Sequence, residues 1–443
     1  MPDFRQKGYL MTANSSRRTL LKAALASPAA FSVGRSQAET SSPSYTSPHS
    51  INVVDLPGEY DIDPTIHNLE NGYWGVMPRV VAETYARHTI AVNRSNSIWA
   101  RNMLPGGACL AGGGHDARAA IARQVGCDID ELAIARSGSD ALQMLIANYK
   151  PLRPGDAVIH CDLDYDAMIA AVNWLGDHRG AQIVSFVMPE PATTANILQA
   201  YQDILNRTPR AKLLLVTQVS NRTGLVTPVR EIVAMARARG VDTIVDAAHG
   251  IACLDFQLAD IDADFVGWSV HKWTSAPLGT GALYVRKNRL QDIDIAFDNG
   301  DIPAGSVTAR IPAGTINFAA ILSIPTAVDF HFAIGAAAKE RHLRALRNRW
   351  VDQVRDLPNV EICVPDDPDR YCTITSFRLR GMKTDADAQK LQRTLFEKYR
   401  VHTVWRKGVH NGPVVRVTPG LYNTYAASDA LVAALRKEHT LFL

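Results

Sequence analysis

The sequence predicts an α/β protein in which a large, mixed and mostly parallel sheet is sandwiched by helices and followed by a smaller C-terminal α+β domain. From residue 131 to 246, short β-branched runs alternate with segments of helical periodicity. Such alternation is typical of a doubly wound sheet with right-handed crossovers. From about residue 349, shorter strand and helix patterns follow one another. The length of 443 residues accommodates both domains.

The individual elements are predicted in chain order from the spacing of apolar residues. An extended segment over 64–73 comes first, then a helix over 78–91 that starts with proline, a glycine-rich loop over 105–114 and a helix over 116–125. Strands over 132–135, 157–160, 182–187, 213–219, 243–246 and 264–268 alternate with helices over 140–149, 165–175, 197–205 and 229–239. An antiparallel return over 272–285 and a long helical region over 318–346, broken near Pro325, complete the large domain. The small domain has predicted strands over 360–364, 373–379 and 414–417 and helices over 385–399 and 428–438.

The first 38 residues have the pattern of an export signal. Arg17 and Arg18 precede Leu20-Leu21-Lys22, an apolar run follows over 23–31, and Ser36-Gln37-Ala38 has the form of a cleavage site. The arginine pair resembles a twin-arginine signal, which predicts a periplasmic protein. The alternative is an amphipathic first helix of the fold, but residues 40–49 are rich in Ser and Pro. We therefore expect a signal over 1–38, a linker over 39–63, a large domain over 64–348 and a small domain over 349–443.

Composition argues against several classes of protein. The net charge of +3, without a basic run, gives no sign of nucleic-acid binding. No stretch of 18 uninterrupted apolar residues predicts a membrane span in the mature chain. The six cysteines are scattered without a CxxC pair, which argues against a structural metal site or a disulfide framework.

A carboxylate and a lysine follow two predicted strands. Asp246 ends the first strand, and Lys272 follows the second, behind Ser269 and His271. This pair is what pyridoxal 5′-phosphate requires: the lysine amine forms a Schiff base with the aldehyde, and the carboxylate keeps the pyridine nitrogen protonated. Lysines and aspartates are common, so the pair alone is only suggestive.

Three further segments follow strands of the same predicted sheet. Ser137, Gly138 and Ser139 begin a helix, where backbone amides bind a phosphate, although an ordinary helix cap has the same pattern. Tyr165 is placed to stack on a pyridine ring, or is a half-buried surface tyrosine. Asn221 is a hydrogen-bond partner for the cofactor phenolic oxygen or the substrate carboxylate, or a turn residue before Thr223-Gly224.

In this order, the segments resemble the class V aminotransferase-fold enzymes of fold type I, a group of pyridoxal 5′-phosphate-dependent enzymes. The group includes cysteine desulfurases, isopenicillin N epimerase and hercynylcysteine sulfoxide lyases. The resemblance covers residues 68–435. It rests on Ser137-Gly138-Ser139, Tyr165, Ser220-Asn221, Asp246-Ala247-Ala248-His249, Ser269-Val270-His271-Lys272, Gly314-Thr315 and Arg416.

The resemblance implies a role for each matching residue. Lys272 is the Schiff-base lysine and proton shuttle, and Asp246 pairs with the pyridine nitrogen. His249 contacts the cofactor phenolic oxygen, and Arg416 grips the substrate carboxylate through its planar fork. Thr315 reaches the phosphate of a second subunit, which implies a homodimer with composite sites. The phosphate itself is held by Gly138, Ser139, Ser269 and His271.

One difference from the desulfurases and one similarity to the isopenicillin N epimerase-like branch indicate which residues bind the substrate. Desulfurases carry a nucleophilic cysteine in the loop before the substrate-binding arginine, but residues 405–412 contain none. Arg406 or His410 of this loop is therefore a candidate for recognising a polar substrate tail. The segment from Asn68 to Gly72 resembles the isopenicillin N epimerase-like branch, which adds Asn68 to the substrate-binding candidates.

We therefore expect an exported enzyme that acts on an amino acid or amine and removes its α-proton. An aminotransferase-type reaction ranks first, an epimerase or racemase second and a C–S lyase third. A protein that binds the cofactor without turnover is the remaining alternative.

Overall fold

The computed structural model describes residues 50–101, 114–297, 302–312 and 314–443. These residues all belong to one unit. The predicted signal over 1–38, the linker up to residue 49 and nearly all of the glycine-rich loop over 105–114 lie outside the described residues.

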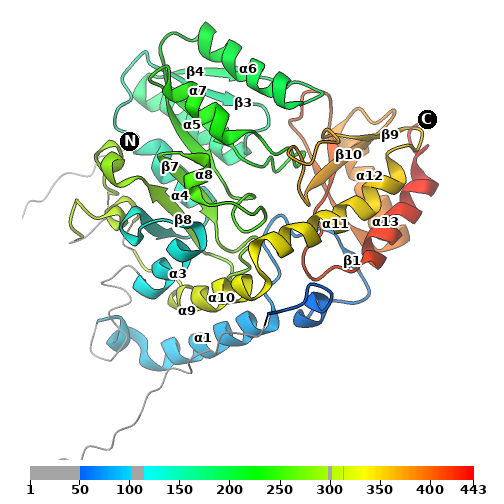
Figure 1. Ribbon diagram of the computed structural model, residues 1–443, viewed down its shortest axis with the longest axis horizontal. Helices are drawn as coiled ribbons and strands as arrows, with labels where there is room; N and C mark the ends of the chain where they lie inside the picture. The colour runs from blue at the N-terminus through cyan, green and yellow to red at the C-terminus, as the bar shows by residue number, and fades with distance from the viewer. Residues whose placement is uncertain (1–49, 102–113, 298–301, 313) are drawn as a thin grey trace, which may run out of the picture. The chain divides into compact units, whose positions relative to one another are not determined.

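A seven-stranded sheet forms the centre of this unit (Figure 1). Its strands are β2 (Leu132–Ala135), β3 (Ala157–Cys161), β4 (Gln182–Phe186), β5 (Ala211–Thr217), β6 (Asp242–Asp246), β7 (Phe265–Ser269) and β8 (Gly281–Val285). Their order is β2-β8-β7-β6-β5-β3-β4. β8 runs antiparallel to both of its neighbours, whereas the other neighbouring pairs are parallel. The predicted mixed, mostly parallel sheet is confirmed.

Helices cover both faces of this sheet. Successive strand residues point to opposite faces, so Val158 and Ile159 of β3 belong to different apolar clusters. One face packs on α4 (Gly138–Ala147) and α5 (Asp166–Arg179). The other packs on α3 (His115–Val125), α6 (Thr194–Arg207), α7 (Val229–Arg237) and α10 (Ile324–Ile334). Because both faces of the sheet are buried, every residue of a central strand such as β3 is buried.

The C-terminal part forms a smaller sheet. α11 (Ala336–Val354) leads into four antiparallel strands in the order β12-β13-β10-β9. In Figure 1, α13 lies along α11 on the side of this sheet. The predicted boundary between residues 348 and 349 falls inside α11 and stays a prediction. The remaining bounds are β9 (Val360–Ile362), β10 (Thr375–Leu379), α12 (Asp385–Tyr399), β12 (Val404–Arg406), β13 (Val414–Val417) and α13 (Tyr425–Glu438).

An N-terminal segment joins the C-terminal part. β1 (His67–Asn68) pairs in parallel with β11 (Val401–His402), and Glu70 forms a parallel bridge with Thr418. Residues 67–72 therefore lie at the end of β13, although more than 300 positions of sequence separate the two segments. This pairing thereby places Glu70 beside Arg416.

Two helical regions differ from their predicted bounds. α1 (Arg79–Ala100) extends past residue 91, with a non-helical residue at Asn96. The region predicted over 318–346 is three helices: α9 (Phe318–Leu322), α10 and α11. Pro325 lies in the first turn of α10, where its missing N–H costs no intrahelical bond, so it starts a helix. Gly335, with φ of 82°, separates α10 from α11.

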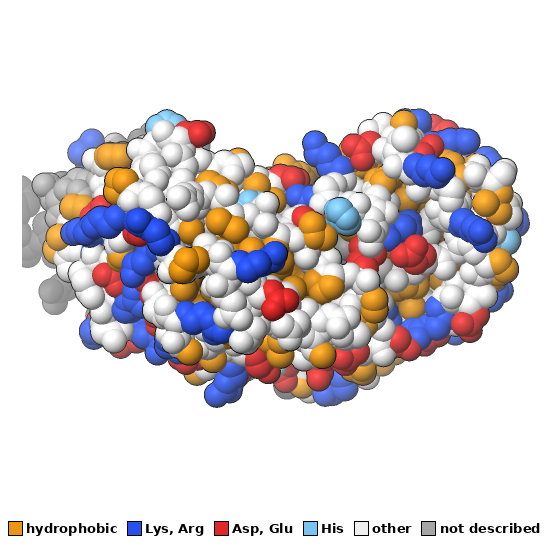
Figure 2. All heavy atoms as spheres, turned by 90° about the horizontal axis from the view of Figure 1, so that it is seen from above, with side chains coloured by type: hydrophobic (Ala, Val, Ile, Leu, Met, Phe, Trp, Pro, Cys, Tyr) orange, Lys and Arg blue, Asp and Glu red, His pale blue; other side chains and the backbone are white. Residues whose placement is uncertain are grey.

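The described helices include no single one that is long and apolar enough to cross a membrane. The segments Phe318–Ile334 and Ala336–Val354 meet the criteria only when joined, and they are bent by 77°. On the face shown in Figure 2, basic and acidic side chains are interspersed, as is typical of a solvated protein surface.

Candidate active site

The carboxyl ends of β2, β3, β5, β6 and β7 meet at one edge of the large sheet, because β2 and the parallel strands all run the same way. Ligands bind at this edge in open α/β sheets. A cavity of about 370 Å³ lies here. Eleven predicted site residues line it, namely Gly138, Ser139, Tyr165, Asn221, Asp246, His249, Ser269, His271, Lys272, Arg406 and Arg416.

Lys272 and His249 lie next to each other in this cavity. Lys272 Nζ lies 3.0 Å from His249 Nε2, and the indole Nε1 of Trp273 donates to His249 Nδ1 at 3.3 Å. An indole N–H only donates, so Nδ1 must be the unprotonated nitrogen and Nε2 carries the proton. Burial, followed by the charge of Lys272, keeps the pKa of His249 well below its usual range. With Nε2 protonated, a neutral His249 donates only to the unprotonated form of the Lys272 amine.

The protonation of Lys272 follows from its surroundings. Burial lowers the pKa of Lys272 to about 8, while Asp246 opposes this shift and Arg416 adds to it. The amine is therefore partly neutral close to neutral pH, which a nucleophile or base requires.

Asp246 ends β6 between the ends of β5 and β7. Its side chain accepts a hydrogen bond from the Ala248 amide at 2.9 Å and is almost completely buried. Burial raises the pKa of Asp246, and the Ala248 amide and Lys272 oppose the rise. A buried carboxylate at this position suits a cationic ring nitrogen as its partner.

The start of α4 is the candidate phosphate-binding part of the site. The Gly138 amide donates to Ser269 Oγ at 3.0 Å, and Ser137 caps the helix by accepting from the Asp140 amide. A Cβ on residue 138 would lie 2.7 Å from Ser269 Oγ, so glycine allows the loop after β2 to approach β7. Free amides at a helix N-terminus bind an anion.

His271 lies in the same part of the site. Its Nδ1 is 2.7 Å from the Thr280 carbonyl oxygen, which only accepts, so Nδ1 carries the proton. Burial lowers the pKa of His271 to about 4, the hydrogen bond to Thr280 opposes this shift, and Lys272 lowers the pKa further. His271 donates to a phosphate from Nε2 only when protonated, and a phosphate dianion nearby favours that form.

Two residues complete the cavity around a planar ring. Tyr165 precedes α5 and is half-buried. Asn221 is buried, and its Oδ1 has no hydrogen-bond partner within the described chain. Because a buried amide oxygen without a partner is costly, this atom is available to a ligand.

Arg416 lines the cavity, but its guanidinium already has hydrogen-bond partners within the chain. Its Nη1 donates to the Asn221 carbonyl at 2.8 Å, and its Nη2 donates to Glu70 Oε1 at 2.6 Å. Glu70 lies in the segment from Asn68 to Gly72 that resembles the isopenicillin N epimerase-like branch, but the sequence predicted no role for it. The one signal in the sequence was an acidic residue in the extended segment predicted over 64–73. Trp273 and Thr217, which also contact or line the site, were missed as well.

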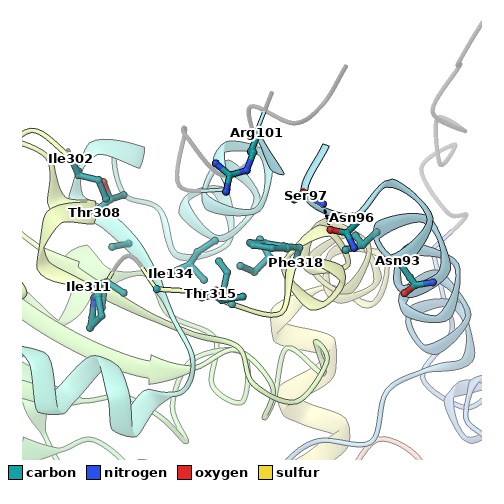
Figure 3. Close-up of a pocket in the computed structure, with 16 residues that line it drawn as sticks. Asn93, Asn96, Ser97, Arg101, Ile134, Ile302, Thr308, Ile311, Thr315 and Phe318 are labelled. Atoms are coloured by element: carbon teal, nitrogen blue, oxygen red, sulfur yellow. Dashed lines mark hydrogen bonds between the residues drawn. The ribbon is translucent and has the colours of Figure 1, made fainter. Parts of the chain in front are cut away.

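Asn68 and Thr315 are not among the residues that line this cavity. Asn68 accepts from the Glu70 amide at 3.1 Å, so it positions the segment that carries Glu70. Thr315 lines a separate cavity of about 700 Å³, together with Ile134 and Phe318 (Figure 3). A contact between Thr315 and the site of a second subunit stays a prediction.

The cavity fits a phosphorylated pyridine aldehyde. The first turn of α4 brings Gly138 and Ser139 to the cavity to hold the phosphate, and Lys272 offers an amine to the aldehyde. Asp246 offers a negative charge to the ring nitrogen, and Asn221 offers an unpaired oxygen to a ring substituent. The volume of about 370 Å³ is within the usual range for small-ligand sites.

Comparisons with known proteins agree with this fit. A relative called isopenicillin N epimerase, from Streptomyces clavuligerus, is 29% identical over 85% of this chain and 96% of its own length. A probable cysteine desulfurase from Vibrio cholerae is 25% identical over 81% of this chain and 88% of its own length. The crystal structure of a cysteine desulfurase from Escherichia coli matches 89% of this chain and all of its own, with 19% identity and a TM-score of 0.74. Residues 93–403 match the aminotransferase class-V family. The chain therefore belongs to this family, and its cofactor is pyridoxal 5′-phosphate.

Proposed function

We propose that the protein removes the α-proton of an amino acid, with Lys272 as the base, and that an aminotransferase-type reaction follows. The observation that carries the proposal is the Lys272 amine, which lies in the cavity with a pKa of about 8. The guanidinium of Arg416 lines the same cavity and suits the substrate carboxylate. An amine near a carboxylate-binding group is what α-proton transfer on an amino acid requires.

The other residues support this step. Bound pyridoxal 5′-phosphate supplies the electron sink for the α-carbon. His249 holds the Lys272 amine through the hydrogen bond from Nε2, and Trp273 fixes the tautomer that makes this bond possible. Asp246 supplies a buried negative charge for the ring nitrogen. Lys272 is the one lysine among the described residues that line the cavity. Lys272 would therefore both remove and return the proton. A single base of this kind favours the aminotransferase-type reaction, whose product is a 2-oxo acid.

Epimerisation is the second candidate. The relative from Streptomyces clavuligerus and one from Amycolatopsis lactamdurans both bear the name isopenicillin N epimerase. Inversion at the α-carbon requires a proton donor on the side opposite Lys272, and the Tyr165 hydroxyl is a candidate because Tyr165 lines the cavity. A desulfurase reaction is less favoured because residues 405–412 contain no cysteine.

A panel of L-amino acids in D₂O tests the proposal. We expect 2-oxo acid, measured by mass spectrometry, from at least one amino acid. Formation of α-deuterated D-amino acid without 2-oxo acid would establish epimerisation instead. If amines lacking a carboxylate react while no amino acid exchanges its α-proton, the proposed function is wrong.

We also propose a homodimer in which Thr315 contributes to the partner's site. Lys272→Ala damages its own site, and Thr315→Trp would damage the site of its neighbour. A mixed dimer would then carry both lesions in one site and leave the other intact. We expect mixing of the two inactive variants to restore up to half of the wild-type activity per heterodimer. No recovery, in dimers that are shown to exchange subunits, would place Thr315 outside the partner's site.

Export by the twin-arginine route is a further proposal. Replacing both Arg17 and Arg18 by Lys should retain the protein in the cytoplasm, because this route recognises the arginine pair itself. Arg35→Lys makes the same chemical change outside the pair and should leave export unchanged. Fractionation followed by immunoblotting measures the outcome. Periplasmic accumulation of the double variant would contradict the proposed route.

A further inference from the structure

Glu70 neutralises Arg416 from outside the cavity. Its Oε1 accepts from Arg416 Nη2 at 2.6 Å and from the Gly72 amide at 3.1 Å, but Glu70 itself is not among the residues that line the cavity. The Arg416 and Glu70 side chains are 1% and 9% exposed. Burial raises the pKa of Glu70, but the charge and hydrogen bond of Arg416, followed by the charges of Arg406 and His402, outweigh this, and the net pKa is lowered. Arg416 and Glu70 are therefore a buried, ionised pair with no net charge.

Gly72 makes this arrangement possible. A Cβ on residue 72 would lie 2.5 Å from Arg416 Nη2 and 2.8 Å from Arg416 Cζ. The backbone after Glu70 therefore passes directly over the guanidinium, and a larger residue would displace it. Arg416 is held by Glu70, by the Asn221 carbonyl and by this close approach.

Arg406 is a second buried guanidinium of the cavity, and among the described residues no carboxylate forms an ion pair with it. Val404 is paired with Arg416 across β12 and β13, so Arg406, two residues further along β12, is on the same face as Arg416. Within the described part of the chain, Arg406 has no ion pair, and its Nε is buried without a hydrogen bond. Burial and then repulsion by Arg416 lower the pKa of Arg406 to about 10, while Glu70, Tyr165 and Asp166 oppose this shift, so Arg406 is charged at neutral pH.

The two guanidinium groups and one carboxylate leave a net charge of +1 in this part of the site. One substrate carboxylate cancels it, whereas a second would be buried without a partner, which is strongly unfavourable. Arg136 also lines the cavity, but its side chain is 46% exposed and faces its own Asp140 at 3.9 Å. Water therefore screens Arg136, and it is a poor partner for a buried anion.

We propose that Glu70 determines specificity: by neutralising Arg416, it restricts the site to amino acids that carry a single carboxylate, which Arg406 and Arg416 bind together. This inference rests on the proposed function, in which the substrate is an amino acid. Without the charge of Glu70, the same two arginines would have a net charge of +2 and would suit a dicarboxylic amino acid.

The test compares butyrate with succinate, which have the same number of carbon atoms and no amine to react with the cofactor. Calorimetry with the holoenzyme at pH 7.5 gives the two dissociation constants. We expect the wild type to prefer butyrate roughly tenfold or more, because the second carboxylate of succinate has no buried partner. Glu70→Gln keeps an acceptor for the Gly72 amide but removes the charge. It should shift the ratio toward succinate by roughly tenfold or more.

Two further variants complete the experiment. Glu397→Gln, on the exposed end of α12, makes the same chemical change away from the site and should leave both constants unchanged. Arg406→Gln should weaken butyrate binding by roughly tenfold or more, and it tests the proposal even if Glu70→Gln does not fold.

Three results would overturn the inference: equal or tighter binding of succinate by the wild type, a ratio that Glu70→Gln does not change, or butyrate binding that is unaffected in Arg406→Gln. Binding requires no turnover. A shifted ratio in a protein that turns over no amino acid would refute the proposed function alone. Amino-acid turnover with an unshifted ratio would refute this inference alone.

Discussion

Lys272→Ala should lower turnover by roughly four orders of magnitude, the upper end of what one positioned acid–base group contributes. Under the proposed function, the variant loses both the amine that binds the cofactor aldehyde and the base that removes the α-proton. No second lysine among the described residues lines the cavity to replace it. The His249 Nε2 proton also loses its acceptor, because that acceptor is the Lys272 amine at 3.0 Å. The rate is measured with the best amino acid from the panel, together with the absorbance of the cofactor–lysine adduct.

Lys407→Ala is the matched control. Lys407 is exposed in the loop that follows β12, and its contact with Arg222 is made by the backbone carbonyl. The same truncation there should leave rate and absorbance close to wild type. If Lys272→Ala keeps more than about a hundredth of the wild-type rate, well above what loss of this group predicts, Lys272 is not the base.

Asp246→Asn should retain the cofactor but lose most of the activity. The substitution keeps the shape of the side chain and an oxygen for the Ala248 amide, but it removes the buried negative charge. Removing one partner of a buried ion pair costs about 3–5 kcal/mol, which corresponds to roughly 10²–10⁴-fold in rate if the loss falls on the transition state. Cofactor content by absorbance and turnover by product formation separate the two effects.

Asp177→Asn, on the exposed side of α5, is the control for this prediction. It should change neither quantity. A turnover rate within about threefold of wild type in Asp246→Asn, less than 1 kcal/mol, would show that Asp246 has only a structural role.

Much of the fold follows from local sequence patterns. The strands Leu132–Ala135 and Val414–Val417 and the helix Asp385–Tyr399 have the predicted bounds. The helix bounds are sharp because Thr384 forms a capping box and Arg400 ends the helix with φ of 55°. Parallel strands bring their carboxyl ends together. The strand pattern alone therefore predicts that Gly138, Asp246 and Lys272 lie in one cavity.

Other parts of the site depend on long-range contacts. Glu70 and Arg416 are 346 positions apart, and their pairing requires β1 to join β11 and Glu70 to bridge Thr418. A strand of two residues such as β1 has too little periodicity for prediction. Arg406 was expected in a loop, but it ends β12, because pairing with β13 extends the sheet into that segment.

Reduction with borohydride followed by peptide mapping tests the central claim most directly. The reagent fixes the cofactor on the lysine that holds it, and mass spectrometry identifies that lysine. Lys339 is the sharpest rival, because burial lowers its pKa to about 8 as well. Its amine, however, donates to the Trp273 carbonyl, and Lys339 is not among the residues that line the cavity. The account predicts a pyridoxyl group on Lys272, and a pyridoxyl group on Lys339 or any other lysine would contradict it.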